Sequence, residues 1–178
     1  QTFLASADGV TVITDGLREF TPADRPCHTI WPAADARYFG PRTRPVGFRR
    51  ILDASPETTV LFYHGNVHAS NRQEVRELYA AVLELNCANE GVMLIRAGLD
   101  TIDFLDELAT EVAPYIINIG QILHRHLAPL MALADIFVQP GVPGAFNDYR
   151  FPSKLPEFFS LGLPLVLPRT NLGKNLRH

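Results

Sequence analysis

The sequence predicts an α/β protein with a Rossmann-like parallel sheet and helices on both of its faces. Short apolar runs alternate regularly with helical patterns, which is typical of βαβ units. The 178 residues carry 47% hydrophobic and 20% charged side chains, enough apolar surface for the core of an ordinary globular domain. Because the connections between successive strands are short, they require right-handed crossovers.

The first strand of the predicted sheet covers residues 58–64 (TTVLFYH), and a helix over residues 71–86 follows it. Ser70 or Asn71 suits the N-cap of this helix. Five apolar side chains share one helical face at the i, i+3, i+4, i+7 spacing, namely Val75, Leu78, Tyr79, Val82 and Leu85. They predict a helix that packs against the sheet.

Three further strands follow with the same alternation. They are predicted over residues 91–96 (GVMLIR), 115–119 (YIINI) and 135–139. Residues 101–112 have a helical pattern with inward-facing Ile102, Leu105 and Leu108. Another helix is predicted before the strand at 135–139, through Leu127, Leu130, Met131 and Leu133.

The first 55 residues lack the regular alternation of strands and helices. Strands are predicted over residues 10–14 and 28–31, with a short helix near residues 17–20. Prolines interrupt the rest of this stretch at Pro22, Pro26, Pro32, Pro41 and Pro45. The expected organisation is residues 1–41 as the end of a preceding domain with its linker, and residues 42–178 as a second domain.

Composition and charge exclude several classes of protein. The formal net charge is −3 and the pI about 6.1, so the chain lacks the basic footprint of a nucleic-acid-binding protein. The basic residues are scattered, no apolar run has transmembrane length, and the N-terminus lacks the pattern of a secretion signal. Cys27 and Cys87 have no motif spacing, which favours two reduced thiols in a cytoplasmic protein.

The run at residues 146–168 (FNDYRFPSKLPEFFSLGLPLVLP) is the most informative part of the sequence. Pro152 suits the first turn of a helix, Gly162 suits its end, and residues 163–167 are predicted as a strand buried on both faces. The helix carries an apolar stripe formed by Leu155, Phe158 and Phe159. Four polar side chains beside the N-terminus of this helix favour a site for a phosphate-bearing ligand, namely Asn147, Asp148, Arg150 and Lys154.

This run resembles the donor-binding segment of the retaining glycosyltransferases of family 4, which have the GT-B fold of two Rossmann-like domains facing a cleft. The family motif is Glu-x7-Glu followed by small residues, Gly, Pro and an apolar strand. Tyr149 stands where the first glutamate would fall, whereas the second half is matched by Glu157, Gly162, Pro164 and Val166. Five other segments resemble the family in the same order, over residues 30–41, 62–68, 94–98, 118–122 and 130–141.

The resemblance implies transfer of a hexose from a nucleoside diphosphate sugar to a carbohydrate or another hydroxyl acceptor, without a metal or other cofactor. It makes residues 42–178 the nucleotide-sugar-binding half of a GT-B fold, apparently truncated at the C-terminus. Acceptor contacts then belong to a domain outside the sequence, and the isolated chain is expected to transfer no sugar. Membrane contact is expected only through the missing segments.

Individual residues take roles from the resemblance. Glu157 would accept hydrogen bonds from the ribose hydroxyls, and Lys154 and Arg150 would bind the diphosphate. Asn147, Asp148 and Tyr149 would face the transferred sugar.

Two more candidates follow the first predicted strand of the sheet. Gly65 and Asn66 lie where ligands bind in doubly wound sheets, and Gly65 would allow the backbone to approach a phosphate.

Other interpretations stay open. By periodicity alone, Glu157 fits a solvated helix glutamate and Lys154 an exposed helix residue, while residues 147–149 fit an Asx-turn in a surface loop. The same two-domain scaffold also serves sugar-nucleotide epimerases and phosphorylases. The absent first glutamate is equally consistent with a noncatalytic nucleotide-binding or scaffold module.

The histidines and the absent motifs complete the analysis. His64 and His68, like His124 and His126, lack the further ligands of a zinc site and are expected to be ordinary hydrogen-bonded or solvated side chains. The sequence contains no Gly-x-Ser-x-Gly, Walker or Gly-x-Gly-x-x-Gly motif, so serine hydrolases, P-loop proteins and classical dinucleotide-binding proteins are not indicated.

Overall fold

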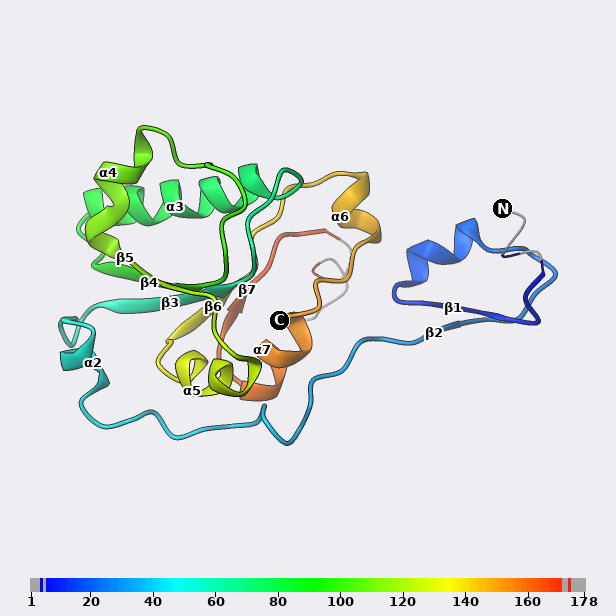
Figure 1. Cartoon of the computed structure of the whole chain (residues 1–178), viewed down its shortest axis with the longest axis horizontal. Coiled ribbons are helices and arrows are strands. Elements are labelled where there is room, and N and C mark those ends of the chain that lie inside the picture. The colour runs from blue at the N-terminus through cyan, green and yellow to red at the C-terminus, as the bar shows by residue number, and fades with distance from the viewer. Residues whose placement is uncertain (1–3, 5, 171–172, 174–178) are drawn as a thin grey trace.

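The computed structural model describes residues 4, 6–170 and 173, and over these residues its main body is a five-stranded parallel sheet (Figure 1). The strand order is β5-β4-β3-β6-β7, and each neighbouring pair is parallel. The strands are β3 (Thr59–His64), β4 (Val92–Ala97), β5 (Ile116–Gly120), β6 (Ile136–Val138) and β7 (Leu165–Val166). The predicted Rossmann-like fold class is confirmed.

Helices cover both faces of the sheet, so the sheet separates two apolar cores (Figure 1). One core lies under α3 (Arg72–Cys87) and α4 (Leu108–Val112). The other core lies against α5 (Leu127–Met131) and α7 (Leu155–Leu161). Two 3-10 turns lead into neighbouring elements, η2 (Ala113–Tyr115) before β5 and η3 (His124–His126) before α5.

The central strand β3 shows why the apolar run folds this way. Val60 and Phe62 face one core, whereas Leu61 and Tyr63 face the other, because successive side chains of a strand point to opposite faces. All four are buried. A run without polar interruptions is therefore what a central parallel strand requires.

The strand order fixes where a ligand can bind. From β3 the chain moves outward to β4 and β5, and it then crosses back to β6 and β7 on the other side of β3. The order therefore reverses between β3 and β6. In open α/β sheets, ligands bind at such a switch point, outside the carboxyl ends of the strands.

Residues 101–112 differ from the expected helix, because regular α-helix begins only at α4. The backbone N–H of Thr101 donates to the carbonyl oxygen of Val67 over 3.0 Å, and its hydroxyl donates to the same oxygen over 2.8 Å. Val67 also forms an isolated parallel bridge with Asp100. These bonds tie the start of the segment to the loop after β3, which prevents helix formation there.

The segment around α7 also differs from expectation. A short helix, α6 (Ala145–Tyr149), lies in the predicted loop, and α7 begins at Leu155, so Pro156 rather than Pro152 occupies its first turn. Gly162 ends α7 in the left-handed conformation, at φ 73°, as predicted. Phe159 is 45% exposed and lies outside the core.

The last predicted strand is not buried on both faces. It shortens to β7, which lies at the edge of the sheet beside β6, and Val166 is 55% exposed. The sequence pattern could not distinguish an edge position from a central one, because both accept an apolar run.

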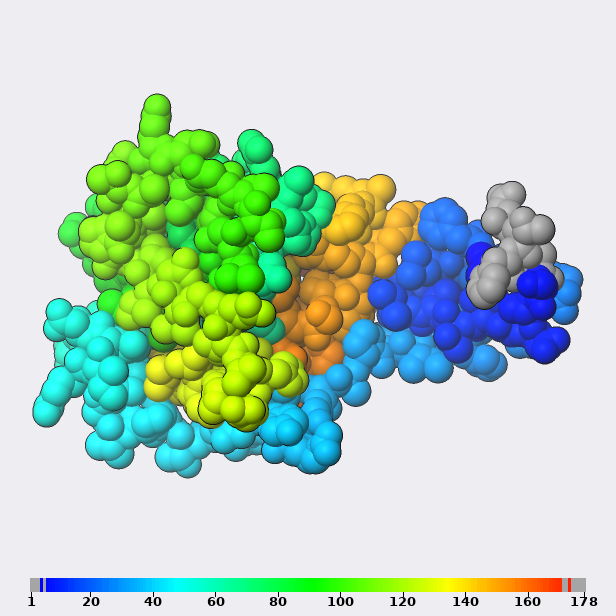
Figure 2. All heavy atoms as spheres, viewed as in Figure 1, coloured from blue at the N-terminus to red at the C-terminus, as the bar shows by residue number. Residues whose placement is uncertain are grey.

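The N-terminal elements lie apart from the five-stranded sheet, beside α6 (Figures 1 and 2). A parallel pair, β1 (Val10–Val12) and β2 (Cys27–Thr29), flanks the 3-10 helix η1 (Asp15–Phe20). The hydroxyl of Thr14 donates to the carbonyl oxygen of Tyr149 over 3.1 Å, and the Phe20 and Tyr149 rings pack edge to face. The domain boundary near residue 41 stays a prediction.

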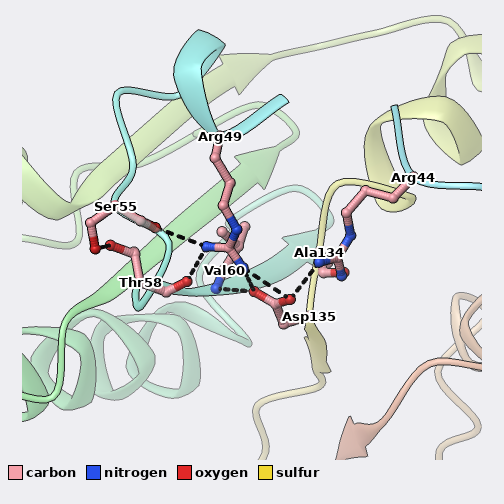
Figure 3. Close-up of polar contacts among 7 residues, drawn as sticks. All are labelled: Arg44, Arg49, Ser55, Thr58, Val60, Ala134 and Asp135. Atoms are coloured by element: carbon pink, nitrogen blue, oxygen red, sulfur yellow. Dashed lines mark hydrogen bonds and ion pairs between the residues drawn. The ribbon is translucent and has the colours of Figure 1, made fainter. Parts of the chain in front are cut away.

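The connecting segment (residues 30–47) joins β2 to α2 (Phe48–Ile51) and is fastened at the amino ends of β3 and β6 (Figure 3). Asp135 accepts a hydrogen bond from the backbone N–H of Val60 over 2.8 Å and forms ion pairs with Arg44 at 2.8 Å and Arg49 at 3.2 Å. Both guanidinium groups also lie over the Phe48 ring. This cluster lies at the opposite end of the strands from the switch point.

Candidate functional site

Two cavities open at the carboxyl end of β3, where the strand order reverses, and both are lined by His64, Gly65 and Asn66. The larger has a volume of about 490 Å³, and its remaining lining comes from the start of α3 and the start of α7: His68, Asn71, Arg150, Phe151, Pro152, Ser153, Lys154 and Glu157. The smaller has about 200 Å³ and is completed by Ala97, Gly98, Gln121, Ile122, His124 and Leu127.

Gly65 and Gly98 bring two loops together, backbone against backbone. Gly65 has φ 144° and Gly98 has φ 138°, a region that favours glycine. A Cβ atom on Gly98 would lie 2.3 Å from the carbonyl oxygen of Gly65. The close approach of the Gly65 and Gly98 loops, which form the floor between the two cavities, therefore depends on glycine at both positions.

Asn66 lines both cavities but uses its side chain to hold the loop. Its Oδ1 accepts a hydrogen bond from the backbone N–H of Leu99 over 3.0 Å, and its carbonyl oxygen accepts one from the Asn71 amide over 3.0 Å. Of the two N-cap candidates, Asn71 occupies the N-cap of α3, yet its Oδ1 accepts from the backbone N–H of His68 instead of a helix N–H. Both asparagines therefore fix the shape of the wall.

Sequence reasoning missed Arg96, which is fully buried beneath this floor. Its Nη2 lies 2.6 Å from the Asp100 carboxylate and donates to the carbonyl oxygens of Gly65 and Leu99. An arginine inside an apolar strand run was the available signal. Because a buried charge requires partners, Arg96 fixes the loops that follow β3 and β4.

Glu157 lies in the first turn of α7, with its carboxylate between two imidazole rings. Its Oε1 is hydrogen bonded to Nε2 of His124 at 2.9 Å, and its Oε2 lies 3.0 Å from Nε2 of His64. The side chain is 14% exposed. Burial raises the pKa of Glu157, but the two imidazoles outweigh that effect and leave it below its ordinary value, so the carboxylate stays ionised.

The two histidines belong to different elements, and their role was not predicted. His64 ends β3, and its ring packs edge to face on Phe158 at 5.3 Å. Burial lowers its pKa despite the neighbouring Glu157 carboxylate, so His64 is neutral at pH 7. His124 lies in η3, and its ring centroid is 4.9 Å from that of Phe39 in the connecting segment.

Lys154 occupies the N-cap position of α7 and reaches across Gly65. Its Nζ lies 5.3 Å from the centroid of the Tyr63 ring, and a Cβ on Gly65 would come within 3.3 Å of that nitrogen. Burial, and then the nearby charge of Arg150, lowers the pKa of Lys154 to about 8. A cation held this close to glycine backbone is suited to binding an anion.

Arg150 lines the same cavity and is oriented from behind by Glu74. Its Nη2 lies 3.7 Å from Oε2 of Glu74, a residue of α3 that is only 5% exposed. The amide of Asn147 donates to Glu74 and, over 2.9 Å, to the carbonyl oxygen of Val142.

The structure therefore brings five of the seven predicted site residues to one cavity, namely Gly65, Asn66, Arg150, Lys154 and Glu157. Asn147 is buried behind Arg150, and neither it nor Asp148 lines either cavity. Tyr149 packs against Phe20. Within the described part of the chain, no three His, Cys, Asp or Glu residues are placed to hold a metal ion. No described helix is long and apolar enough to cross a membrane.

Comparison with known proteins identifies related sequences and folds. The family model described as glycosyl transferases group 1 matches residues 58–177. No curated protein matches the chain.

Several solved structures resemble the chain. Anabaena HepE in complex with UDP and glucose aligns over 97% of this chain and 47% of that one, with a TM-score of 0.68 and 16% identity. Sucrose-phosphate synthase from Thermosynechococcus elongatus aligns over 92% and 41%, with a TM-score of 0.61 and 19% identity. The pneumococcal O-GlcNAc transferase GtfA, in complex with UDP and GlcNAc, aligns over 92% and 30%, with a TM-score of 0.61 and 17% identity. The chain thus shares their fold and spans less than half of each.

Proposed function

The chain belongs to the glycosyl transferases group 1 family, and from this premise we propose that it is the donor-binding half of a retaining glycosyltransferase of family 4. The whole enzyme would transfer a hexose from a nucleoside diphosphate sugar to a hydroxyl acceptor. Residues 42–178 would bind the donor, and residues 1–41 would end the preceding, acceptor-binding domain. Two of the similar structures hold UDP together with a sugar, which supports this class of ligand.

The observation that carries the proposal is the position of Glu157 beside both cavities. It lines the larger cavity together with Lys154 and Arg150, and its two histidine neighbours line the smaller one. An ionised carboxylate is a strong acceptor for a pair of hydroxyls, whereas the two cations suit a diphosphate. A nucleotide would place its base in the smaller cavity, its ribose on Glu157 and its diphosphate beside Lys154.

The chemistry then depends on positioning and electrostatics. The bond from the anomeric carbon of the sugar to the diphosphate breaks and a bond from that carbon to the acceptor oxygen forms. Lys154 and Arg150 would stabilise the negative charge that develops on the departing phosphate. In a same-face mechanism, that phosphate helps to remove the proton of the acceptor hydroxyl. Acceptor and donor must be held together for this step, so the acceptor half of the enzyme is required.

Tyr149 stands where the family places a glutamate, and its contact with Phe20 directs it to the N-terminal elements. The sugar hydroxyls would therefore be bound by other groups in this chain. The same departure favours a second candidate function, a module that binds nucleotide sugar without transferring it. The two candidates differ in turnover by the whole protein and share nucleotide binding by this chain.

Calorimetric titration of UDP, GDP and ADP into the purified chain tests the proposal. We expect one nucleotide to bind selectively, and Glu157→Ala to weaken it by about ten- to a hundredfold, because hydrogen bonds to an ionised group are lost. Glu84→Ala, which removes an exposed glutamate from α3, is the matched control and should bind like the parent. Absence of binding by the folded parent would refute the proposal, as would an unchanged affinity of Glu157→Ala. Sugar transfer by the isolated chain would contradict the placement of the acceptor site elsewhere.

A further inference from the structure

The orientation of the Glu157 carboxylate is restricted by two side-chain contacts, in addition to its position on α7. The carboxylate is approached from two sides by side chains from elements distant in sequence, His64 at the end of β3 and His124 in η3. A glutamate side chain otherwise rotates freely about its terminal bonds, and burial of its stem alone leaves the plane of the carboxylate undetermined.

The two contacts differ in kind. His124 is hydrogen bonded to Oε1 in good geometry, at 2.9 Å. Nε2 of His64 lies 3.0 Å from Oε2 of Glu157. Within the described residues, both of these atoms are buried, and neither has a partner in good hydrogen-bonding geometry. Both atoms are closed to solvent and lie within reach of each other, so His64 restrains Oε2 at the end of β3. The oxygen left to meet a ligand hydroxyl is Oε1, which His124 contacts, and a carboxylate oxygen can accept more than one hydrogen bond.

Burial does not account for the position of His124 beside Glu157. The His124 side chain is 57% exposed, so it adds little to the apolar core, and ordering it costs side-chain entropy. Its consequence is local: it occupies one acceptor site on Oε1 and leaves the other acceptor sites of the carboxylate unused. Because its ring also packs on Phe39 and Tyr38, the role of His124 must be tested with a replacement that keeps a donor as well as one that removes it.

We propose that His124 is a positioning residue, which orients the Glu157 carboxylate beside His64 so that it receives the vicinal hydroxyls of a ribose. The inference rests on the proposed nucleotide site. A histidine in this role must present its Nε2–H to Oε1, because an ionised carboxylate only accepts hydrogen bonds. Glutamine can donate from a similar position, and alanine cannot.

The test compares two ligands that differ only in the hydroxyls concerned. The nucleotide that the chain binds best among UDP, GDP and ADP is titrated beside its 2′,3′-dideoxy form, against the parent, His124→Ala and His124→Gln. For the parent we expect a preference for the ribose form of about tenfold or more. His124→Ala should reduce that preference to about threefold or less, with the dideoxy affinity unchanged, and His124→Gln should restore it.

His126→Ala is the control, because His126 lies in the same turn, is exposed, and contacts Arg125 rather than Glu157. It should keep the parental preference. Equal loss of affinity for both ligand forms would show a structural effect on the cavity and overturn the positioning role. A full ribose preference in His124→Ala would also overturn it while leaving the nucleotide site intact. A parent that binds no nucleotide would overturn both proposals.

Discussion

Glu74 and Asn147 are joined by a hydrogen bond that links α3 to α6 across 73 residues of sequence. The Glu74 carboxylate is only 5% exposed, and its second oxygen faces Arg150. A buried carboxylate is costly unless it is paired and hydrogen bonded. The bond therefore belongs to the support of the cavity, because it keeps Glu74 in place behind Arg150.

Asn147→Ala should lower the free energy of unfolding by about 1–3 kcal/mol, because it leaves the buried Glu74 with one partner fewer. Urea denaturation followed by circular dichroism measures this change. Gln73→Ala removes an exposed amide from α3, which bonds to the exposed Glu77, and should be close to neutral. Equal stability of the Asn147 variant and the parent would show that the bond does not support the fold.

Gly98→Ala should destabilise the protein by about 2–4 kcal/mol and abolish nucleotide binding. The new methyl group would collide with the Gly65 carbonyl oxygen, and φ 138° strains any residue with a side chain. Thermal unfolding and calorimetry report the two effects separately. Gly40→Ala is the control, since a Cβ there meets nothing within 4 Å. A Gly98 variant as stable as the parent would contradict the described approach of the two loops.

Nucleoside diphosphate affinity should fall as the pH rises above about 8, because Lys154 loses its proton there. Its pKa is lowered to about 8 by burial and by Arg150, against the attraction of Glu157 and Glu74. Between pH about 7 and 9.5 we expect a loss of about three- to tenfold by calorimetry. The pKa of Tyr63 is raised by burial to about 12, so it does not titrate in this window.

Lys154→Arg separates this titration from other effects of alkaline pH, because arginine stays charged throughout. Its affinity should be flat over the same window. The folded protein also binds the Lys154 proton less tightly than the unfolded chain, whose lysine has its ordinary pKa of 10.5. The resulting cost to stability is therefore full below pH about 8 and disappears as the pH rises through 10.5. A parental affinity that does not change with pH would remove Lys154 from the diphosphate site.

Asp135→Ala should lower the free energy of unfolding by about 1–3 kcal/mol without changing nucleotide affinity. It removes the shared partner of Arg44 and Arg49 and an acceptor for Val60, at the end of the strands away from the cavities. Denaturation in urea and a parallel titration with nucleotide test both parts. Asp24→Ala removes an exposed ion-pair partner instead and should change neither quantity. Weaker nucleotide binding by Asp135→Ala would show that the two ends of the sheet are not independent.

Much of the fold could be predicted because central parallel strands are encoded by continuous apolar runs. The strand predicted over 58–64 is found as Thr59–His64, and the one predicted over 91–96 as Val92–Ala97. Of the helix predicted over 101–112 only Leu108–Val112 is found, because hydrogen bonds from Thr101 to Val67 override the helical pattern at its start. The local periodicity of a sequence contains no information about such long-range hydrogen bonds.

The candidate site was predictable where a run of neighbouring residues forms it, or where a loop follows a central strand, as Gly65 and Asn66 follow β3. Arg150, Lys154 and Glu157 lie within eight positions of one another, and the structure places them on one cavity. The histidines were not found, because His64 and His124 meet Glu157 only through the folding of separate elements. Asn147 was expected to face a ligand from a loop, but it lies in α6 and bonds to Glu74, because the sequence does not reveal which partner a polar residue will find.

The contact between Phe39 and His124 extends the site into the connecting segment. Phe39 is itself buried in the core below the sheet, and His124 is bonded to Glu157. If binding at Glu157 draws on His124, thermodynamic reciprocity requires that docking of Phe39 and binding of ligand favour each other by the same coupling free energy. The position of the connecting segment and the occupancy of the cavity would then respond to each other.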